Sequence, residues 1–330
     1  MLKLPVNHSV FSSEALAPAL KDLYEIGDVI ECRFLSNGLN DTYVLKTSTG
    51  KYILRIYKVK WRSIHDIAFE VEMLNHLVRK GIPVSGPVAK RDGGYITEMD
   101  AAEGPRFAVL FTYAEGGYSD KKESCDLFGE QVAKMHLAMD DFECGHERFA
   151  IDLNHLLKQP VQLIRPALAH RPEDLDFLDS LSNLLTNRIN DISSELEWGV
   201  SHGDLHGGNV HFHENSLTQF DFDCGGFGWR SYDVSVFLWA KVRGREKEHF
   251  NNELWDVFLQ SYQKHKGLSE SDLKAIPLFV AIREIWLMGL HTGNAEVWGG
   301  GWQNDHYFDT NLQFLRNWCE FHSIVEQRKG

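Results

Sequence analysis

The stretch "HGDLHGGN" (residues 202–209) combines an aspartate, an asparagine, two histidines and three glycines within eight positions. Asp204 and Asn209 are the side chains in it that can offer oxygen atoms to a cation or a proton. The glycines allow sharp backbone bends between them. Such a segment is either a simple turn or a loop that directs a carboxylate and an amide at one reacting centre.

A second acidic segment, "LTQFDFDCGG" (217–226), follows and contributes Asp221 and Asp223. Between the two segments, "VHFH" and "LTQFDFD" alternate apolar and polar residues, which predicts a hairpin with "ENS" as its turn. Because a hairpin brings its two ends together, we expect the aspartates of both segments and Asn209 to lie close together. Carboxylates and an amide oxygen suit Mg²⁺ that carries nucleotide phosphates. A carboxylate left free nearby can accept a hydroxyl proton, so the set favours phosphoryl transfer.

The pattern of apolar and polar residues changes along the chain. In residues 29–115, β-branched and aromatic runs between turn residues predict strands and one amphipathic helix, at 29–58, 66–81, 94–99 and 106–114. Beyond them, helical patterns are expected at 123–139, 174–197, 230–242, 250–264, 272–292 and 304–326. An earlier helix, with Ser13 as its expected cap, is predicted from the spacing of three leucines. The sequence therefore predicts an α+β fold with a small antiparallel sheet and a larger helical part.

The charge is distributed unevenly. The chain of 330 residues has a net charge of −13. Residues 1–115 carry 14 Lys+Arg and 14 Asp+Glu, so the whole acidic excess lies in residues 116–330. A net acidic chain argues against binding to nucleic acid, whose phosphates require a basic surface. An acidic cleft would favour a cationic acceptor, although the same acidity is equally suited to solubility alone.

Three further features bear on the cellular location. No apolar stretch approaches the length of a membrane span, so no membrane association is expected. The first residues lack the apolar run of a signal peptide. Five cysteines without a Cys-x-x-Cys pair suggest neither a disulfide framework nor a zinc site. We therefore expect a cytoplasmic protein.

"HGDLHGGN" followed by "DFD" resembles the catalytic and metal-binding loops of the aminoglycoside phosphotransferase/choline kinase family, small-molecule kinases with a two-lobed, protein-kinase-like fold. The resemblance extends to "LSNGLNDTYVL", "YILRIY", "EVEML" and "SYDVSVFLW", and covers roughly residues 30–325. It is nearest to the branch of the bacterial stress-response kinase and the homoserine-kinase-like enzymes. It implies an N-terminal helical extension (1–28), a nucleotide-binding N-lobe (29–115) and a catalytic, acceptor-binding C-lobe (116–330).

The resemblance also implies roles for single residues. Asp204 would be the catalytic base, and Asn209 and Asp221 would be magnesium ligands. Arg55 would hold the α- and β-phosphates of ATP, with Glu70 orienting it. The implied nucleotide-binding residues together are Gly38, Asn40, Arg55, Glu70, Thr112, Tyr113 and Ala114, the last three through their backbone at the adenine.

Arg55 departs from the family pattern, in which this cation is more often a lysine. Arginine neutralises phosphate and donates two hydrogen bonds at once, but it is bulkier and differently shaped. Lys46 and Lys58 lie near it in the sequence and could take its place. The choice between ATP and GTP therefore stays open.

The remaining candidates have competing interpretations. Asp223 is either a second metal or acceptor contact or a loop residue that makes hydrogen bonds. Trp298 and Trp302, in the glycine-rich "EVWGGGWQND", are candidates for the acceptor site, although aromatic clusters are more often core. Asp233 is expected to hold the catalytic loop through buried hydrogen bonds. His202 is expected to anchor that loop rather than to bind a metal.

The predicted function is an ATP- and Mg²⁺-dependent phosphotransferase that acts on a hydroxyl of a small polar, possibly amine-bearing, metabolite or antibiotic. A Ser/Thr protein kinase of the stress-response type is the first alternative. However, only "CGGFGWRSY" separates Asp223 from Asp233, which is too short for the platform on which protein kinases bind peptides. A non-catalytic nucleotide-binding protein is the second alternative, and the intact Asp/Asn/Asp set argues against it.

Overall fold

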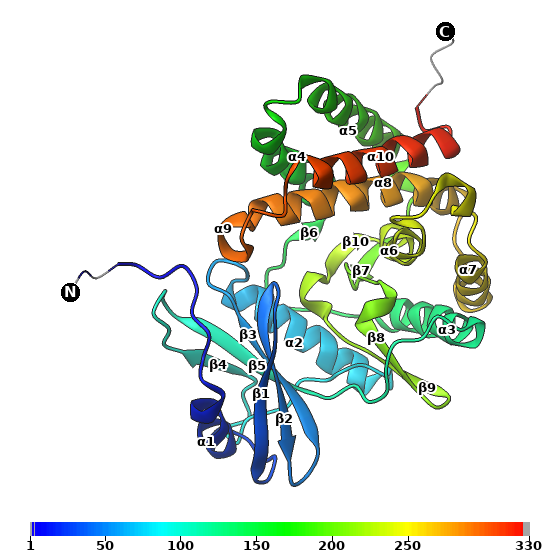
Figure 1. Ribbon diagram of the computed structural model, residues 1–330. Coiled ribbons are helices and arrows are strands. Elements are labelled where there is room, and N and C mark those ends of the chain that lie inside the picture. The colour runs from blue at the N-terminus through cyan, green and yellow to red at the C-terminus, as the bar shows by residue number, and fades with distance from the viewer. Residues whose placement is uncertain (1, 3, 326–330) are drawn as a thin grey trace. The chain divides into compact units, whose positions relative to one another are not determined.

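The strands predicted in residues 29–115 form a five-stranded antiparallel sheet in the computed structural model, which describes residues 2 and 4–325 (Figure 1). The sheet has the order β1-β2-β3-β5-β4, with β1 (Val29–Asn37), β2 (Asn40–Thr47), β3 (Lys51–Tyr57), β4 (Ile96–Met99) and β5 (Arg106–Thr112). Arg55 lies on the central strand β3, opposite Thr42 on one side and Val109 on the other. Both neighbouring strands therefore fix its backbone position.

Two helices cover the two faces of this sheet. Helix α1 (Ser13–Leu23) packs on the face formed by alternate residues such as Leu45 and Leu54. Helix α2 (Ile64–Arg79) meets the opposite face, where its Glu70 contacts β3. The period of two along a strand sends neighbouring side chains to opposite faces. The expected cap of α1 was wrong by one residue, because Ser12 occupies that position and makes no side-chain capping bond.

A second, three-stranded sheet carries the loop 202–209. It has the order β6-β10-β7, with β6 (Ala150–Ile151), β7 (Trp198–Ser201) and β10 (Gly226–Trp229). The loop begins directly after β7, and β8 (Val210–His213) follows it. The predicted hairpin forms, since β8 pairs with β9 (Ser216–Gln219) in a two-stranded sheet, but its second strand ends at Gln219 and leaves Asp221 and Asp223 beyond the pairing.

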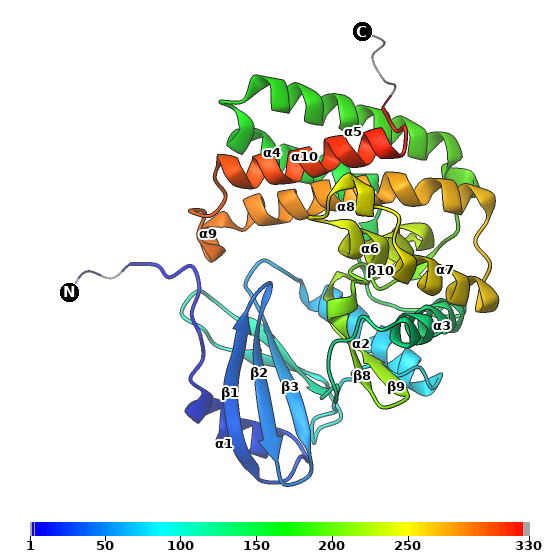
Figure 2. The ribbon, with the colours of Figure 1, turned by 45° about the vertical axis from the view of Figure 1, so that its right-hand side comes forward.

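The helical part surrounds one long, apolar helix. Its helices are α3 (Lys122–Ala138), α4 (Gln159–Ile164), α5 (Pro172–Ile192), α6 (Arg230–Val242), α7 (Glu253–His265), α8 (Glu270–Gly293), α9 (Ala295–Trp298) and α10 (Asp305–Phe321). Helix α8 contacts α4, α5, α6 and α10, and Figure 2 shows α10 running beside it. A helix that is apolar on nearly all sides is buried in this way. Within the described residues, none of the helices has the length and apolar character needed to cross a membrane.

The chain divides into two compact units. Residues 1–116, 142–148 and 218–223 form the first, and residues 117–141, 149–217 and 224–330 form the second. The short segments 142–148 and 218–223 belong to the sheet-rich unit, in which Arg148 donates to the carbonyl oxygen of Asp66 and Asp223 accepts a hydrogen bond from Asn40. The predicted α+β class is confirmed. Of the predicted terminal segments 1–28 and 116–330, residues 1, 3 and 326–330 lie outside the described residues.

Candidate functional site

In the first unit, Arg55 forms the centre of a buried ion network. Its Nη1 donates to Glu70 Oε1 at 2.6 Å, and its Nη2 donates to Asp221 Oδ1 at 2.9 Å. The Tyr57 hydroxyl donates to the second oxygen of Glu70 at 2.7 Å. Burial works to lower the pKa of Arg55, but the charges of Glu70 and Asp221 outweigh it and raise that pKa well above its ordinary value. The cluster therefore presents a permanently charged guanidinium whose orientation is fixed by two carboxylates.

The two lysines near Arg55 lie differently. Lys46 is exposed on β2. Lys58 is buried, and its Nζ donates to Asn37 Oδ1 at 2.5 Å and to the carbonyl oxygen of Gly38 at 2.6 Å. Lys58 thus braces the turn between β1 and β2, in which a side chain on Gly38 would meet nothing within 4 Å. Of the three cations, Arg55 is the one held between the carboxylates of Glu70 and Asp221.

Asp223 is buried, and both of its carboxylate oxygens are engaged. Oδ2 accepts hydrogen bonds from Asn40 Nδ2 and Trp61 Nε1, each at 2.7 Å, and Oδ1 accepts one from Arg62 Nε at 2.7 Å. Burial works to raise the pKa of Asp223, but Arg62 and Arg55 outweigh it and lower that pKa to about 2. This arrangement favours the hydrogen-bonding role for Asp223. It also occupies the amide nitrogen of Asn40, one of the predicted nucleotide contacts.

Asp221 has an unusual backbone. Its φ is 67°, in the left-handed region that few residues other than glycine adopt. Its side chain is 46% exposed, in contrast to the buried side chain of Asp223. A backbone held in this region near reactive groups is typical of functional sites. An exposed carboxylate of this kind is a suitable oxygen ligand for a divalent cation.

In the second unit, Asp233 holds the catalytic loop. Its carboxylate accepts the backbone N–H groups of His202 and Gly203, both at 2.8 Å, and lies 2.9 Å from His136 Nε2. Burial works to raise the pKa of Asp233, but its hydrogen bond to His136 and the neighbouring His202 lower it below its ordinary value. The predicted loop-holding role of Asp233 is confirmed. Gly203 has φ +79°, and a Cβ there would lie 2.1 Å from the carbonyl oxygen of Cys224, so a side chain is excluded.

The loop brings Asp204 and Asn209 together. Asn209 Nδ2 donates to the backbone oxygen of Asp204 at 2.9 Å and to its Oδ2 at 3.2 Å. Both bonds use the amide nitrogen, so the amide oxygen is the atom that can bind a cation. Arg283, on α8, donates from Nη2 to Asp204 Oδ1. Burial works to raise the pKa of Asp204, but Arg283 and then His206 outweigh it and hold that pKa well below its ordinary value.

The sequence analysis missed Arg283 and its neighbour Glu284. Both lie in "LFVAIREIWLMGL" (278–290), an otherwise apolar run in a buried helix. Buried charges are rarely left without partners, so adjacent opposite charges in such a run are a usable signal. The signal reveals that each residue has a partner, but it does not identify Asp204 as that partner.

The predicted adenine-binding backbone is only partly available. The N–H of Thr112 donates to the carbonyl oxygen of Gly86 at 2.9 Å, and its own carbonyl oxygen accepts the Ser85 hydroxyl. Both backbone groups of Thr112 are therefore used within the first unit. The predicted contact of Thr112 is therefore not supported, and the contacts of Tyr113 and Ala114, which follow directly after β5, stay predictions.

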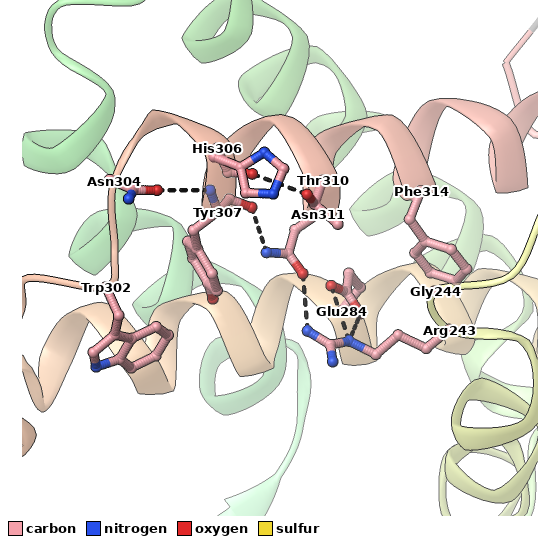
Figure 3. Close-up of a pocket in the computed structure, with 10 residues that line it drawn as sticks. All are labelled: Arg243, Gly244, Glu284, Trp302, Asn304, His306, Tyr307, Thr310, Asn311 and Phe314. Atoms are coloured by element: carbon pink, nitrogen blue, oxygen red, sulfur yellow. Dashed lines mark hydrogen bonds and ion pairs between the residues drawn. The ribbon is translucent and has the colours of Figure 1, made fainter.

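A pocket of about 420 Å³ lies between α8, α10 and the segment after α6 (Figure 3). It is lined by Arg243, Gly244, Glu284, Trp302, Asn304, His306, Tyr307, Thr310, Asn311 and Phe314. Arg243 bridges its polar floor, donating to Glu284 Oε2 at 3.0 Å and to Asn311 Oδ1 at 2.9 Å. Trp302 is 44% exposed at its mouth, whereas Trp298 is not among the lining residues. Of the two predicted acceptor-site tryptophans, the structure places one in a pocket.

Comparison with known proteins agrees with these motifs. The model of the phosphotransferase enzyme family matches residues 31–268. An uncharacterized protein of Deinococcus radiodurans is 36% identical over 96% of this chain and 93% of its own length. A homoserine kinase of Rhodopseudomonas palustris is 31% identical over 81% of this chain and 80% of its own.

Solved structures share the fold. A microcompartment-associated aminopropanol kinase matches with a TM-score of 0.76 and 22% identity, over 94% of this chain and 97% of its own. An amicoumacin kinase in complex with AMP-PNP, Ca²⁺ and Ami matches with a TM-score of 0.75 and 20% identity, over 96% and 98%. At these identities the likeness establishes the kinase-like fold.

The buried charge of Asp223 gives a prediction for stability. Its folded pKa of about 2 lies below the ordinary value of 3.8, so its contribution is complete above about pH 4 and is lost as the pH falls toward 2. The free energy of unfolding of Asp223→Asn should therefore be lower than that of the parent by about 2–3 kcal/mol near neutral pH. Urea unfolding near pH 7, 5 and 3.5 should show this difference shrinking only at the lowest pH. A difference that stays constant to about pH 3.5 would contradict the assignment, and the exposed Asp22→Asn serves as the control.

Proposed function

The chain belongs to the phosphotransferase enzyme family, and we propose that it transfers the γ-phosphate of ATP, with Mg²⁺, to a hydroxyl of a small polar metabolite or antibiotic. It is a kinase that acts on small molecules. The observation that supports the proposed chemistry best is the pair Asp204–Asn209 on a loop fixed by Asp233. Phosphoryl transfer needs positioned, charged groups more than covalent chemistry, and this loop supplies them.

Asp204 is the proposed catalytic base. Its Oδ1 is bound by Arg283, and its Oδ2 lies beside the Asn209 amide. The low pKa keeps the carboxylate ionised at physiological pH, so it can accept the proton of an acceptor hydroxyl as the oxygen attacks phosphorus. An ionised base of low pKa takes up the proton late, when the O–P bond is largely formed.

Asn209 and Asp221 are the proposed magnesium ligands. Each offers an oxygen atom, and the exposed carboxylate of Asp221 is suited to a hard divalent cation. When bound, the ion neutralises charge on the phosphates during transfer. Arg55, oriented by Glu70, donates to the phosphates, and the backbone of Tyr113 and Ala114 receives the adenine.

The pocket of Figure 3 is the proposed acceptor site. Trp302 and Tyr307 offer aromatic surface, whereas the carboxylate of Glu284 is already paired with Arg243 and accepts a hydrogen bond from Trp239. The aromatic rings suit an acceptor that carries an amine. Similar proteins include an aminopropanol kinase and homoserine kinases, whose named substrates carry an amine. The nine residues between Asp223 and Asp233 form β10 and the start of α6, which supports a small acceptor over a peptide. Because the five cysteines are free, we also propose a reducing cytoplasmic location.

Replacement of the base tests the chemistry. Asp204→Asn should lower the turnover number by about 10²–10⁴ while leaving ATP affinity nearly unchanged, because the amide cannot accept the hydroxyl proton. Turnover and ATP binding would be measured with a panel of amino alcohols, aminoglycosides and a generic basic protein. The exposed Asp176→Asn, on α5, is the matched control. Turnover within tenfold of the parent would remove Asp204 from this role, and phosphate found only on protein would overturn the small-molecule acceptor.

Replacement of the metal ligand tests the cofactor. Asp221→Ala should abolish the magnesium-dependent part of the rise in melting temperature that ATP produces, because the remaining ligand set is too small. The rise would be measured by thermal unfolding with ATP, with and without magnesium. Asp22→Ala, which removes an exposed carboxylate from α1, should behave as the parent does. An unchanged magnesium-dependent rise in Asp221→Ala would show that this carboxylate does not bind the metal.

Replacement of Trp302 tests the acceptor site. Trp302→Ala should raise the KM for an amine-bearing acceptor by about tenfold, from the loss of an aromatic surface over the cation, and leave the KM for ATP unchanged. Trp198→Ala removes a tryptophan of similar exposure, on β7 and outside the pocket, and should leave both values unchanged. A rise in the KM for ATP alone would place the acceptor elsewhere.

A further inference from the structure

Arg283 brings a buried positive charge to Asp204 from a helix 79 residues further along the chain. Only 2% of its surface is exposed. Its guanidinium lies over the ring of Trp286 at 4.3 Å and over that of Trp239 at 4.9 Å. Its Nη1 donates to the Tyr232 hydroxyl at 3.4 Å. Two indole rings therefore limit the plane in which Arg283 meets Asp204.

The partners of Arg283 are not those of a residue that serves stability alone. In the part of the chain that the structure describes, Asp204 is the one carboxylate paired with it, and its buried Nε has no hydrogen-bond partner. The neighbouring Glu284 is paired with Arg243 instead. A buried ion pair gains little over an apolar pair of similar size, because both charges lose their water. Among the described residues, the one carboxylate that this buried guanidinium orients is that of Asp204.

We propose that Arg283 is a positioning residue for phosphoryl transfer: it binds Oδ1 of Asp204, so that Oδ2, beside Asn209, is the oxygen that receives the acceptor proton. This inference rests on the proposed role of Asp204 as the base. As the acceptor oxygen forms its bond to the γ-phosphorus and the bond from that phosphorus to the oxygen of the leaving ADP breaks, the proton of the hydroxyl passes to Oδ2, while Arg283 stays bound to Oδ1. The arrangement removes the freedom of the Asp204 side chain to rotate, which would exchange its two oxygens.

The fixed orientation of Asp204 leads to a measurable consequence. Without Arg283, Oδ1 loses its charged partner and the Asp204 side chain can rotate away from the acceptor hydroxyl. The loss should therefore appear in kcat and leave the KM for ATP unchanged. A residue with a purely structural role would lower the melting temperature without this separation of kcat from KM.

The test compares Arg283→Met and Arg283→Lys. Arg283→Met should lower kcat by about 10–100-fold and leave the KM for ATP unchanged. Arg283→Lys should restore part of the rate, because it retains the charge but not the planar pair of donors. Arg316→Met is the matched control, since Arg316 also pairs with an aspartate, Asp174, at 2.7 Å and stacks on Phe177 at 3.9 Å.

Two outcomes separate this inference from the proposed function. If Asp204→Asn keeps the turnover of the parent, the proposed base is wrong. If Asp204→Asn loses turnover but both Arg283 variants keep the kcat of the parent, only the positioning role is wrong. Should Arg283→Met fail to fold, the comparison rests on Arg283→Lys, in which a kcat reduced at least threefold with an unchanged KM for ATP supports the inference. A kcat equal to that of the parent in Arg283→Lys overturns it.

Discussion

The buried carboxylate of Asp233 is the constraint on which the catalytic loop depends. It accepts two successive backbone N–H groups, those of His202 and Gly203, and contacts His136, which in turn lies 2.8 Å from the Tyr262 hydroxyl. Buried N–H groups without partners are costly, so the backbone of the loop is held in the conformation that directs both N–H groups at this carboxylate. This backbone conformation requires the positive φ of Gly203 and leaves no room for a side chain at that residue. The loop therefore delivers Asp204 in a fixed position before any ligand arrives.

Each unit contains a reactive carboxylate paired with an arginine from a distant element. In the first unit Arg55 on β3 meets Asp221, and in the second Arg283 on α8 meets Asp204. Both guanidinium groups are buried and both are further oriented, one by Glu70 and the other by indole rings. Arginine suits this task because its charge persists at every physiological pH and its donors lie in one plane. The pKa of Asp204 is thereby held low where burial alone would raise it.

The sequence predicts what depends on local pattern. The strands β1 to β3 and the bent loop around Gly203 could be predicted, because the alternation of a strand and the glycines of a bend are visible in neighbouring residues. The three short strands β6, β7 and β10 were missed, since two to four residues carry no period. The partner of Arg283 was missed for a different reason: a charge within an apolar helix signals that it is paired, but tertiary packing alone decides with which residue.

Arginine at position 55 places a guanidinium, and no amine, between the carboxylates of Glu70 and Asp221. A guanidinium is too strongly protonated to act as a nucleophile, so acetylation and amine-directed reagents have no target at this position. The neighbouring amine is Lys58, whose pKa is lowered by burial, which leaves a larger neutral fraction than an exposed lysine has. That amine holds the turn through Asn37 and Gly38. Acylation of Lys58 would therefore loosen the turn between β1 and β2 while the charge of Arg55 remained.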